Sequence, residues 1–434
     1  MSVIFLLEKI SSLVWGTGLL FLLLFTGLFF TFRLKFIQFG LFTFLFRQIK
    51  RKDNSSAQNG FSQLKTVCAS LGTAMGTGNI VGVSAALIAG GAGSIFWMWV
   101  SAFLGMALVY SENYLSVLFK EKNSCFSGPM CYIEKGLGSR RLAMVFSVFC
   151  LLASFGMGGM VQSNSISIAC CNCFNISPIY IALIIFTAVI AVTLGGMKRI
   201  GTVAGIIIPV ITSVYIASSI AVIIIFRENL FSAFRDIFSQ AFSFKSAAGG
   251  VGGYTMSKAL SVGLRRGIFS NEAGLGSSPI MHGTAENTSP SVQGMWSVFE
   301  VFLDTIICCT LTALVLLTSK AENFSINKAF SVVFGSYSDI FIFISITLFA
   351  FCTIIGWYYC GETAFRFITN GKATKAYSIV FSAVTAFGAI SALEAVWTLS
   401  DIFNGLMAFP NLLALILLSF RVKIHTRNKN RYFR

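Results

Sequence analysis

The stretch GTAMGTGNIVG (Gly72–Gly82) interrupts an apolar run that is otherwise long enough to cross a bilayer. Each glycine weakens a helix by about 1 kcal/mol relative to alanine, so the cluster predicts a segment where the helix unwinds. Unwound backbone is tolerated in a membrane only inside the protein or beside a wet cavity. There, free carbonyls can hold a cation and free N–H groups can hold a carboxylate. Close packing of small residues at a helix crossing is the alternative interpretation.

The composition indicates an all-α polytopic membrane protein. Of 434 residues, 56% are hydrophobic and 11% charged, and the mean hydropathy is +0.80. No polar stretch is long enough to form a separate soluble domain. Eleven apolar segments are predicted as spans, at 10–32, 66–89, 94–119, 142–169, 179–194, 203–226, 247–280, 292–318, 340–367, 376–393 and 396–420.

The net charge of +16 has a topological explanation. With the N-terminus outside, most of the lysines and arginines fall in loops on the inner side, as the positive-inside rule requires. We therefore expect an inner (plasma) membrane protein of bacterial type, with an outside N-terminus and a cytoplasmic C-terminus. The lipid bilayer, and not nucleic acid, is the expected partner, and no oligomer is required.

Ten of the predicted spans form two halves of five. An odd number of spans inverts the second half relative to the first. The second half begins with another glycine-rich stretch, AAGGVGGYTM (Ala247–Met256), which predicts a second broken helix. Paired interrupted helices in inverted halves are typical of secondary transporters. The predicted divisions are an extra N-terminal helix with a cytoplasmic linker (1–64), the first repeat (65–226), an extracellular connection (227–246), the second repeat (247–420) and a basic tail (421–434).

Five stretches carry a resemblance to a known family: GTGNIVGV (76–83), GGAGSIFWMWVSAFLGM (90–106), GGMKRIGTVA (195–204), RRGIFSNEAGLGSSPI (265–280) and QGMWSVFEVFLDTIICCTLTALVLL (293–317). They resemble the sodium:alanine (or glycine) symporter family. The resemblance implies a leucine-transporter-like 5+5 inverted repeat with one extra N-terminal helix and broken first and sixth core helices. It also implies coupling to Na⁺ and a small neutral amino acid, alanine or glycine, as substrate.

The substrate-binding candidates are Thr77, Gly78, Asn79, Gln162, Gly250, Thr353 and Trp357. The freed N–H groups of the first break would receive the substrate carboxylate. A glutamine in the middle of a span needs a hydrogen-bond partner, so Gln162 is a candidate for the ammonium, or else a bond between helices.

Thr353 and Trp357 lie four residues apart, on one helix face. The resemblance implies that both line the pocket, where the indole would limit substrate size. A tryptophan at the membrane interface is the alternative. Sodium prefers hard oxygen ligands, and Ala74, Thr77 and Thr353 are the candidates. The resemblance also places an amide side chain where Gly159 stands, so we expect a difference in the substrate pocket.

Three acids are predicted to be gating or structural charges. Glu300 and Asp304 share a helix face, and acids in lipid are often functional. Proton-coupled transport through these two is the alternative function, and a channel is a further one. Glu272 is expected beside Arg265 and Arg266 at the inner edge. With 2 histidines in the chain, a clustered catalytic site is not indicated, so we do not expect an enzyme. The role of Cys170, Cys171 and Cys173 is left open.

Overall fold

The computed structural model describes residues 2–50, 63–120, 126–243, 256–286, 288–372 and 374–423, and within these ranges every regular element is a helix. The first half comprises α1 (Ser2–Val14), α2 (Thr17–Arg33), α3 (Leu41–Lys50), α4 (Gln63–Ala74), α5 (Val81–Gly90), α6 (Gly93–Leu118), α7 (Pro129–Leu137), α8 (Arg140–Ala153), α9 (Val161–Phe174), α10 (Pro178–Thr193) and α11 (Gly196–Ile225). The second half comprises α12 (Leu230–Ala241), α13 (Met256–Asn271), α14 (Ser278–His282), α15 (Pro290–Val301), α16 (Thr310–Ser319), α17 (Ile326–Phe334), α18 (Ser338–Thr369), α19 (Thr374–Ile390) and α20 (Leu393–Leu417).

Seven helical stretches in the described residues are long and apolar enough to cross a membrane. They are Phe5–Arg33, Gly93–Leu118, Arg140–Phe174, Gly196–Ile225, Pro290–Ser319, Ile326–Thr369 and Glu394–Leu417. The other four predicted spans correspond to the shorter helices α10 and α19 and to the interrupted pairs α4–α5 and α13–α14. The count of eleven therefore stays a prediction.

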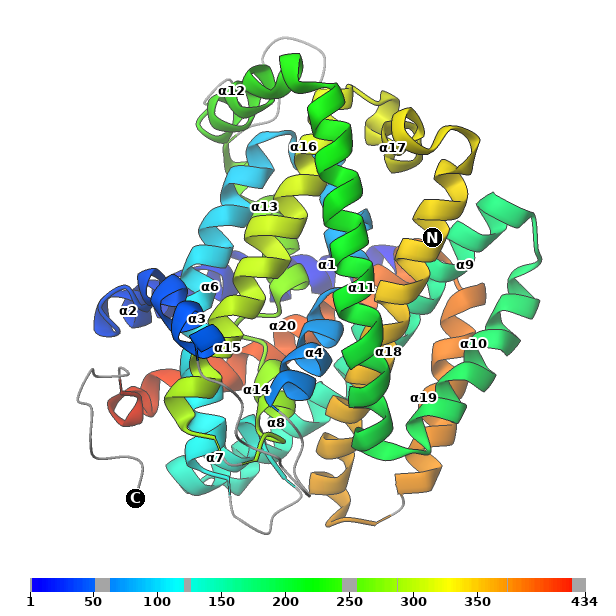
Figure 1. Cartoon of the computed structure of the whole chain (residues 1–434). Helices are drawn as coiled ribbons and strands as arrows, with labels where there is room; N and C mark the ends of the chain where they lie inside the picture. Colours follow the sequence, from blue (N-terminus) through cyan, green and yellow to red (C-terminus); the bar gives the residue numbers. More distant parts are fainter. Residues whose placement is uncertain are drawn as a thin grey trace.

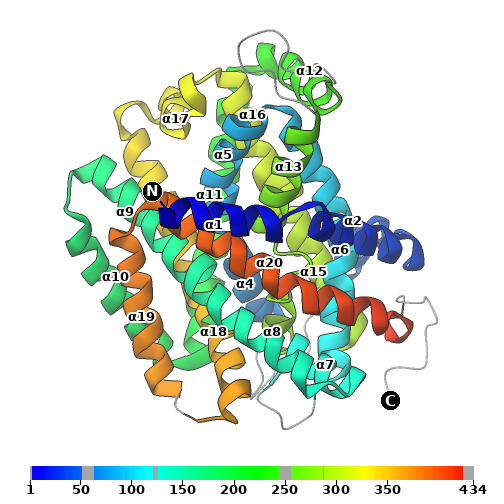
Figure 2. The ribbon, with the colours of Figure 1, turned by 180° about the vertical axis from the view of Figure 1, so that it is seen from behind.

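The helices form one bundle with two distinguishable ends. Figure 1 shows the long helices α11 and α18 side by side, with α12 and α17 at one end and α7 towards the other. From behind, α1 lies across α20, and α10 packs beside α19 (Figure 2). The first predicted span is not a single helix, because the chain turns at Trp15 and Gly16 between α1 and α2. The indole N–H of Trp15 donates to the carbonyl of Asp401 at 2.7 Å, which anchors this turn on α20.

The helix break predicted within Gly72–Gly82 is present. Helix α4 ends at Ala74, a 3₁₀ turn η2 covers Thr77–Asn79, and α5 begins at Val81. Local chemistry explains the position, because glycines and a short polar segment make helix propagation unfavourable here.

A second break lies between α13 and α14. Helix α13 runs unbroken to Asn271, and the chain leaves helical geometry before α14 begins at Ser278. Gly274 and Gly276 have φ of 85° and 90°, a left-handed conformation that glycine adopts at low cost. The single predicted span over 247–280 is therefore two helices. The glycine-rich stretch expected to break it, with Gly250, lies outside the described residues.

The two interrupted helices run antiparallel. Helix α5 packs against α13, and α4 packs against α14, so the first half of each meets the second half of the other. Two other spans contain π-helical segments. These are η3 (Ser154–Met160), between α8 and α9, and η5 (Phe302–Cys309), between α15 and α16. Such segments are frequent at functional sites.

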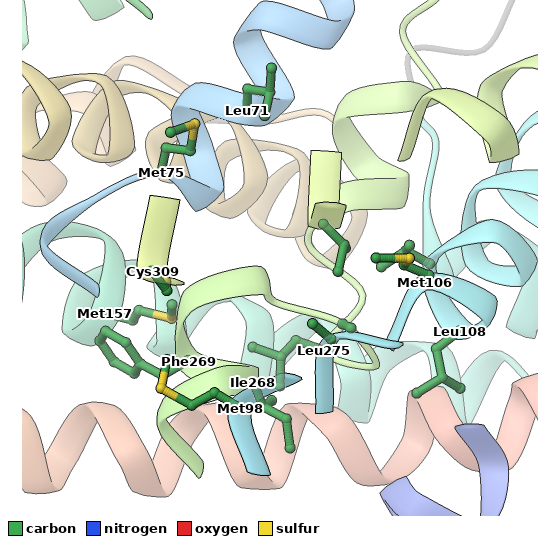
Figure 3. Close-up of a cluster of buried hydrophobic side chains, with 14 of the residues drawn as sticks. Leu71, Met75, Met98, Met106, Leu108, Met157, Ile268, Phe269, Leu275 and Cys309 are labelled. Carbon is green, nitrogen blue, oxygen red and sulfur yellow. The ribbon is translucent and has the colours of Figure 1, made fainter. Parts of the chain in front are cut away.

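Apolar side chains enclose this region. Figure 3 shows Met157 of η3, Phe269 of α13 and Cys309 of η5 lying close together, with Met75 of the first break nearby. Met75 and Met157 are 0% and 2% exposed. The polar groups of the breaks are therefore held within a low-dielectric core.

Candidate functional site

The first break is buried beside two polar side chains from distant helices. Thr77 is fully buried, and its backbone N–H donates to Gln162 Oε1 at 3.2 Å. A Cβ placed on Gly76 would lie 2.6 Å from Thr353 Oγ1 and 2.9 Å from Gln162 Oε1. The predicted residues Thr77, Gln162 and Thr353 therefore meet at one place, and the glycine between them leaves the room for it.

The first break also reaches the end of α13. A Cβ on Gly78 would lie 3.3 Å from the Cα of Ser270, one residue before the last of that helix. The two interruptions of the chain are thus adjacent in space. Gln162 is the second residue of α9, just after η3, and its Nε2 donates to Met157 O at 3.2 Å, which fixes the orientation of the amide.

Several oxygens at the first break suit a hard cation. Thr77 Oγ1 is buried and has no hydrogen-bond partner among the described residues. Thr353 Oγ1 lies 3.0 Å from Gly72 O and 3.2 Å from Phe349 O, and as the donor it retains its lone pairs. The carbonyl of Ala74 accepts from Gly76 N at 2.8 Å and keeps a second lone pair. These are the uncharged oxygen ligands that sodium accepts.

Trp357 is a buried residue, which excludes the interfacial alternative. Its side chain is 0% exposed, and its indole N–H donates to Glu272 Oε1 at 2.8 Å. On its other side lies η3, where a Cβ on Gly158 would come within 2.2 Å of Trp357 Cβ. The tryptophan therefore bridges a π-helical segment and the second break.

Asn79 connects the first break to η5 and α16. Its Nδ2 donates to Asp304 Oδ1 at 2.6 Å, and its carbonyl accepts from Thr312 at 2.8 Å. The other carboxylate oxygen of Asp304 accepts from Ser270 at 2.8 Å and from Thr305 at 2.7 Å. The Asp304 carboxylate thus fastens the first break and the end of α13 to η5.

The three predicted charges line one small cavity. Glu272, Glu300 and Asp304 share it with Ser70, Ala74, Val109, Asn271, Ser278, Ser297 and Val301. Glu300 accepts from Ser70 Oγ at 2.7 Å and lies 2.8 Å from His282 Nε2. Its interaction partners are therefore α4 and α14, the inner halves of the two broken helices under the expected topology.

The expected pairing of Glu272 with Arg265 and Arg266 is wrong. Arg265 instead pairs with Asp401 at 3.0 Å, and the guanidinium of Arg266 lies 4.7 Å from the ring centroid of Trp397. Both arginines precede the second break and their partners lie on α20. The helix directs them away from Glu272, whose carboxylate turns to α18 instead.

Gly159, where the resemblance places an amide side chain, does not face the first break. A Cβ on Gly159 would lie 2.6 Å from Thr385 Oγ1 on α19. The position faces α19 and not the break at Thr77.

Among the described residues, no group of three or more His, Cys, Asp or Glu side chains is placed to hold a metal ion. Cys170, Cys171 and Cys173 are free thiols.

Three residues of this region were missed by sequence reasoning. Ser270 and Asn271 end α13 beside the first break, and Asn271 Nδ2 is buried with no partner in the part of the chain described here. The third is His282, whose two ring nitrogens contact Gln293 Oε1 at 2.6 Å and Glu300 Oε1 at 2.8 Å. The alternating glycines after Asn271 were the available signal for the first two. The partners of His282 have no signature in the sequence.

Comparisons with known proteins agree with this architecture. The model of the sodium:alanine symporter family matches residues 2–433. The chain is 36% identical to the sodium/alanine symporter of Methanococcus maripaludis, over 99% of this chain and 98% of that protein. It is 38% identical to the probable sodium/glutamine symporter of Bacillus subtilis, over 96% and 90%. A manganese transporter from Eremococcus coleocola has a similar fold, with a TM-score of 0.55, 13% identity, and 85% of this chain and 78% of that chain covered. With its many apolar helices, this chain is a multi-pass membrane protein that belongs to the sodium:alanine symporter family.

Proposed function

We propose that this protein is a secondary transporter that carries a small neutral amino acid, alanine or glycine, into the cell together with Na⁺. The observation that carries the proposal is the buried first break, where the Thr77 hydroxyl has no hydrogen-bond partner within the described ranges and the backbone N–H of the same residue donates to Gln162. A buried hydroxyl without a partner is costly inside a membrane protein, so its presence favours a polar ligand at this place.

The break would bind the two cargoes together. Thr77, Gly78 and Asn79 lie just before the first turn of α5, where N–H groups without a helical partner attract a carboxylate. Oxygens of Ala74, Thr77 and Thr353 would hold Na⁺. No acid lies in the break itself, so the substrate carboxylate would complete the charge balance of the ion, and coupling follows from this mutual dependence.

Substrate size would be limited by the walls of the break. Gly76 and Gly78 stand in close contact with Thr353, Gln162 and Ser270, and Trp357 closes the side formed by η3. We therefore expect the site to admit a small side chain only. A relative is named a probable sodium/glutamine symporter, so the size of the preferred amino acid has to be measured for this protein.

The antiparallel packing of α4–α5 against α13–α14 supports the proposed 5+5 inverted repeat with eleven spans and an extra N-terminal helix. On this scheme the chain, with its N-terminus outside, is divided as predicted: the extra helix and linker (1–64), the first repeat (65–226), the extracellular connection (227–246), the second repeat (247–420) and the basic tail (421–434). The two breaks meet at the repeat interface, where alternating access would expose the cargo to either side.

One observation favours a second candidate, proton-coupled transport. Glu300 lies 2.8 Å from the ring of His282, a pair able to share a proton inside the membrane. Asp304 lines the same cavity. In this alternative these groups, and not Na⁺, would supply the coupling.

The test is binding and uptake of radiolabelled alanine, glycine and serine by the purified protein, in detergent and in proteoliposomes. We expect binding that requires Na⁺, uptake that follows a sodium gradient without a proton gradient, and weaker binding in Thr77→Ala and Gln162→Ala. Uptake driven by a pH gradient alone would transfer the proposal to Glu300 and Asp304. Absence of any amino-acid binding would end it.

A further inference from the structure

Glu272 occupies a backbone position where glycine would cost less conformational free energy. It follows α13 directly, and its φ of 55° is left-handed. Helices commonly end on a left-handed glycine, and other residues there cost free energy. The two later left-handed positions of this break, Gly274 and Gly276, are indeed glycines. A glutamate kept in this conformation points to a task for its side chain.

The side chain of Glu272 makes two hydrogen bonds and is 1% exposed. Oε1 accepts from the indole N–H of Trp357 at 2.8 Å, and Oε2 accepts from the hydroxyl of Ser277. None of the ion pairs found in the described ranges includes this carboxylate. A buried carboxylate without a cation depends on its hydrogen bonds. The Trp357 contact is therefore one of two bonds on which this group depends.

Trp357 is fixed from two directions. At its base, Gly158 allows η3 to approach so closely that a Cβ there would lie 2.2 Å from Trp357 Cβ. At its tip, the Nε1 atom is held by Glu272. Between these two points the ring cannot turn without losing the hydrogen bond to Glu272 or displacing backbone. Glu272 therefore controls the direction of the ring.

We propose that Glu272 is a positioning residue that sets the size of the accepted amino acid by holding the indole of Trp357 in place. The inference rests on the proposed function, because Trp357 is taken as the wall of the substrate site. The proposal connects the second break, which carries Glu272, with the face of α18 that carries both Trp357 and Thr353. Glu272 acts through the tryptophan and need not touch the cargo.

The test compares Glu272→Gln with Glu272→Met in the full-length protein. Glutamine keeps an acceptor oxygen for the indole N–H, whereas methionine has a similar length and no such acceptor. The readout is the ratio of the inhibition constants of glutamine and alanine against bound radiolabelled alanine. We expect the ratio to fall about tenfold in Glu272→Met, in line with the loss of one buried hydrogen bond, and to be kept in Glu272→Gln. A merely structural role would alter the amount of folded protein and leave the ratio unchanged.

Two further variants make the result decisive. Glu322→Met makes the same change at a carboxylate whose side chain is 72% exposed and should leave the ratio unaltered. Trp357→Phe removes the donor, so it should lower the ratio by itself, and adding Glu272→Met to it should lower the ratio no further. If Glu272→Met does not fold, Glu272→Ala, which also removes the acceptor, replaces it with and without Trp357→Phe. A wild-type ratio in folded Glu272→Met, or independent effects in the double variant, would overturn the proposal.

A failure of the proposed function is distinguishable from a failure of this inference. If the wild-type protein binds no amino acid, the difference in tryptophan emission between wild type and Trp357→Phe still isolates the Trp357 signal. That signal should shift in Glu272→Met and be retained in Glu272→Gln. An unshifted signal in Glu272→Met would show that Glu272 does not position the ring.

Discussion

Gly76→Ala would place a methyl group where the first break, α9 and α18 converge. The new Cβ would lie 2.6 Å from Thr353 Oγ1 and 2.9 Å from Gln162 Oε1. To restore an ordinary contact of 3.4 Å, these oxygens would have to retreat by about 0.8 Å and about 0.5 Å. Gly76 has a φ of −119°, so alanine is not strained at this position and the effect is one of space.

The displaced groups are the ones proposed to bind the cargo. A hydrogen bond lost or stretched at each of two partners is worth about 1 kcal/mol or more, so alanine affinity should fall at least about tenfold. The measurement is the sodium-dependent dissociation constant of alanine for purified protein, by scintillation proximity, together with the melting temperature to verify the fold.

Gly82→Ala is the matched control, six residues further along the chain. Its Cβ would meet nothing closer than Thr77 O at 3.9 Å, and it lies inside α5, where alanine is the better helix former by about 1 kcal/mol. We expect unchanged alanine affinity and equal or higher thermal stability. Wild-type affinity in folded Gly76→Ala, or an equal loss in both variants, would refute the assignment of the site to this convergence.

Three further outcomes are expected. Thr353→Val removes a hydroxyl proposed as a sodium ligand, so the sodium concentration for half-maximal alanine binding should rise about tenfold. Thr347→Val is the control: it removes a buried hydroxyl of the same helix that has no hydrogen-bond partner in the described structure, and it should leave this concentration unchanged. Asp304→Asn puts an amide among three donors and should lower the free energy of unfolding by about 1–3 kcal/mol, seen as a lower melting temperature, while sodium dependence is kept; loss of sodium dependence in a stable variant would instead make Asp304 a cation ligand. Replacement of Na⁺ by choline should remove the rise in melting temperature that alanine produces, because a ligand stabilises only the state that binds it, and an equal rise in choline would contradict coupled binding.

The sequence by itself determined the all-helical membrane class, the family and the position of the first break. These properties are encoded locally. Hydropathy acts over about twenty successive residues, and the glycines of 72–82 weaken the very helix in which they lie. The pairing of Thr353 and Trp357 on one face also follows from spacing along a helix.

Only the tertiary structure decided the partners of the buried polar groups. Glu272 was expected beside Arg265 and Arg266, yet it binds Trp357, which lies 85 residues away in the chain. Glu300 likewise meets Ser70 from a separation of 230 residues. Inside a low-dielectric core, a carboxylate takes whichever donor the packing of distant helices brings within reach, and sequence spacing holds no record of that packing. The second break is a further case, because glycines occur both in 247–253, outside the described residues, and at 274 and 276, and only the structure shows that Gly274 and Gly276 take positive φ angles between α13 and α14.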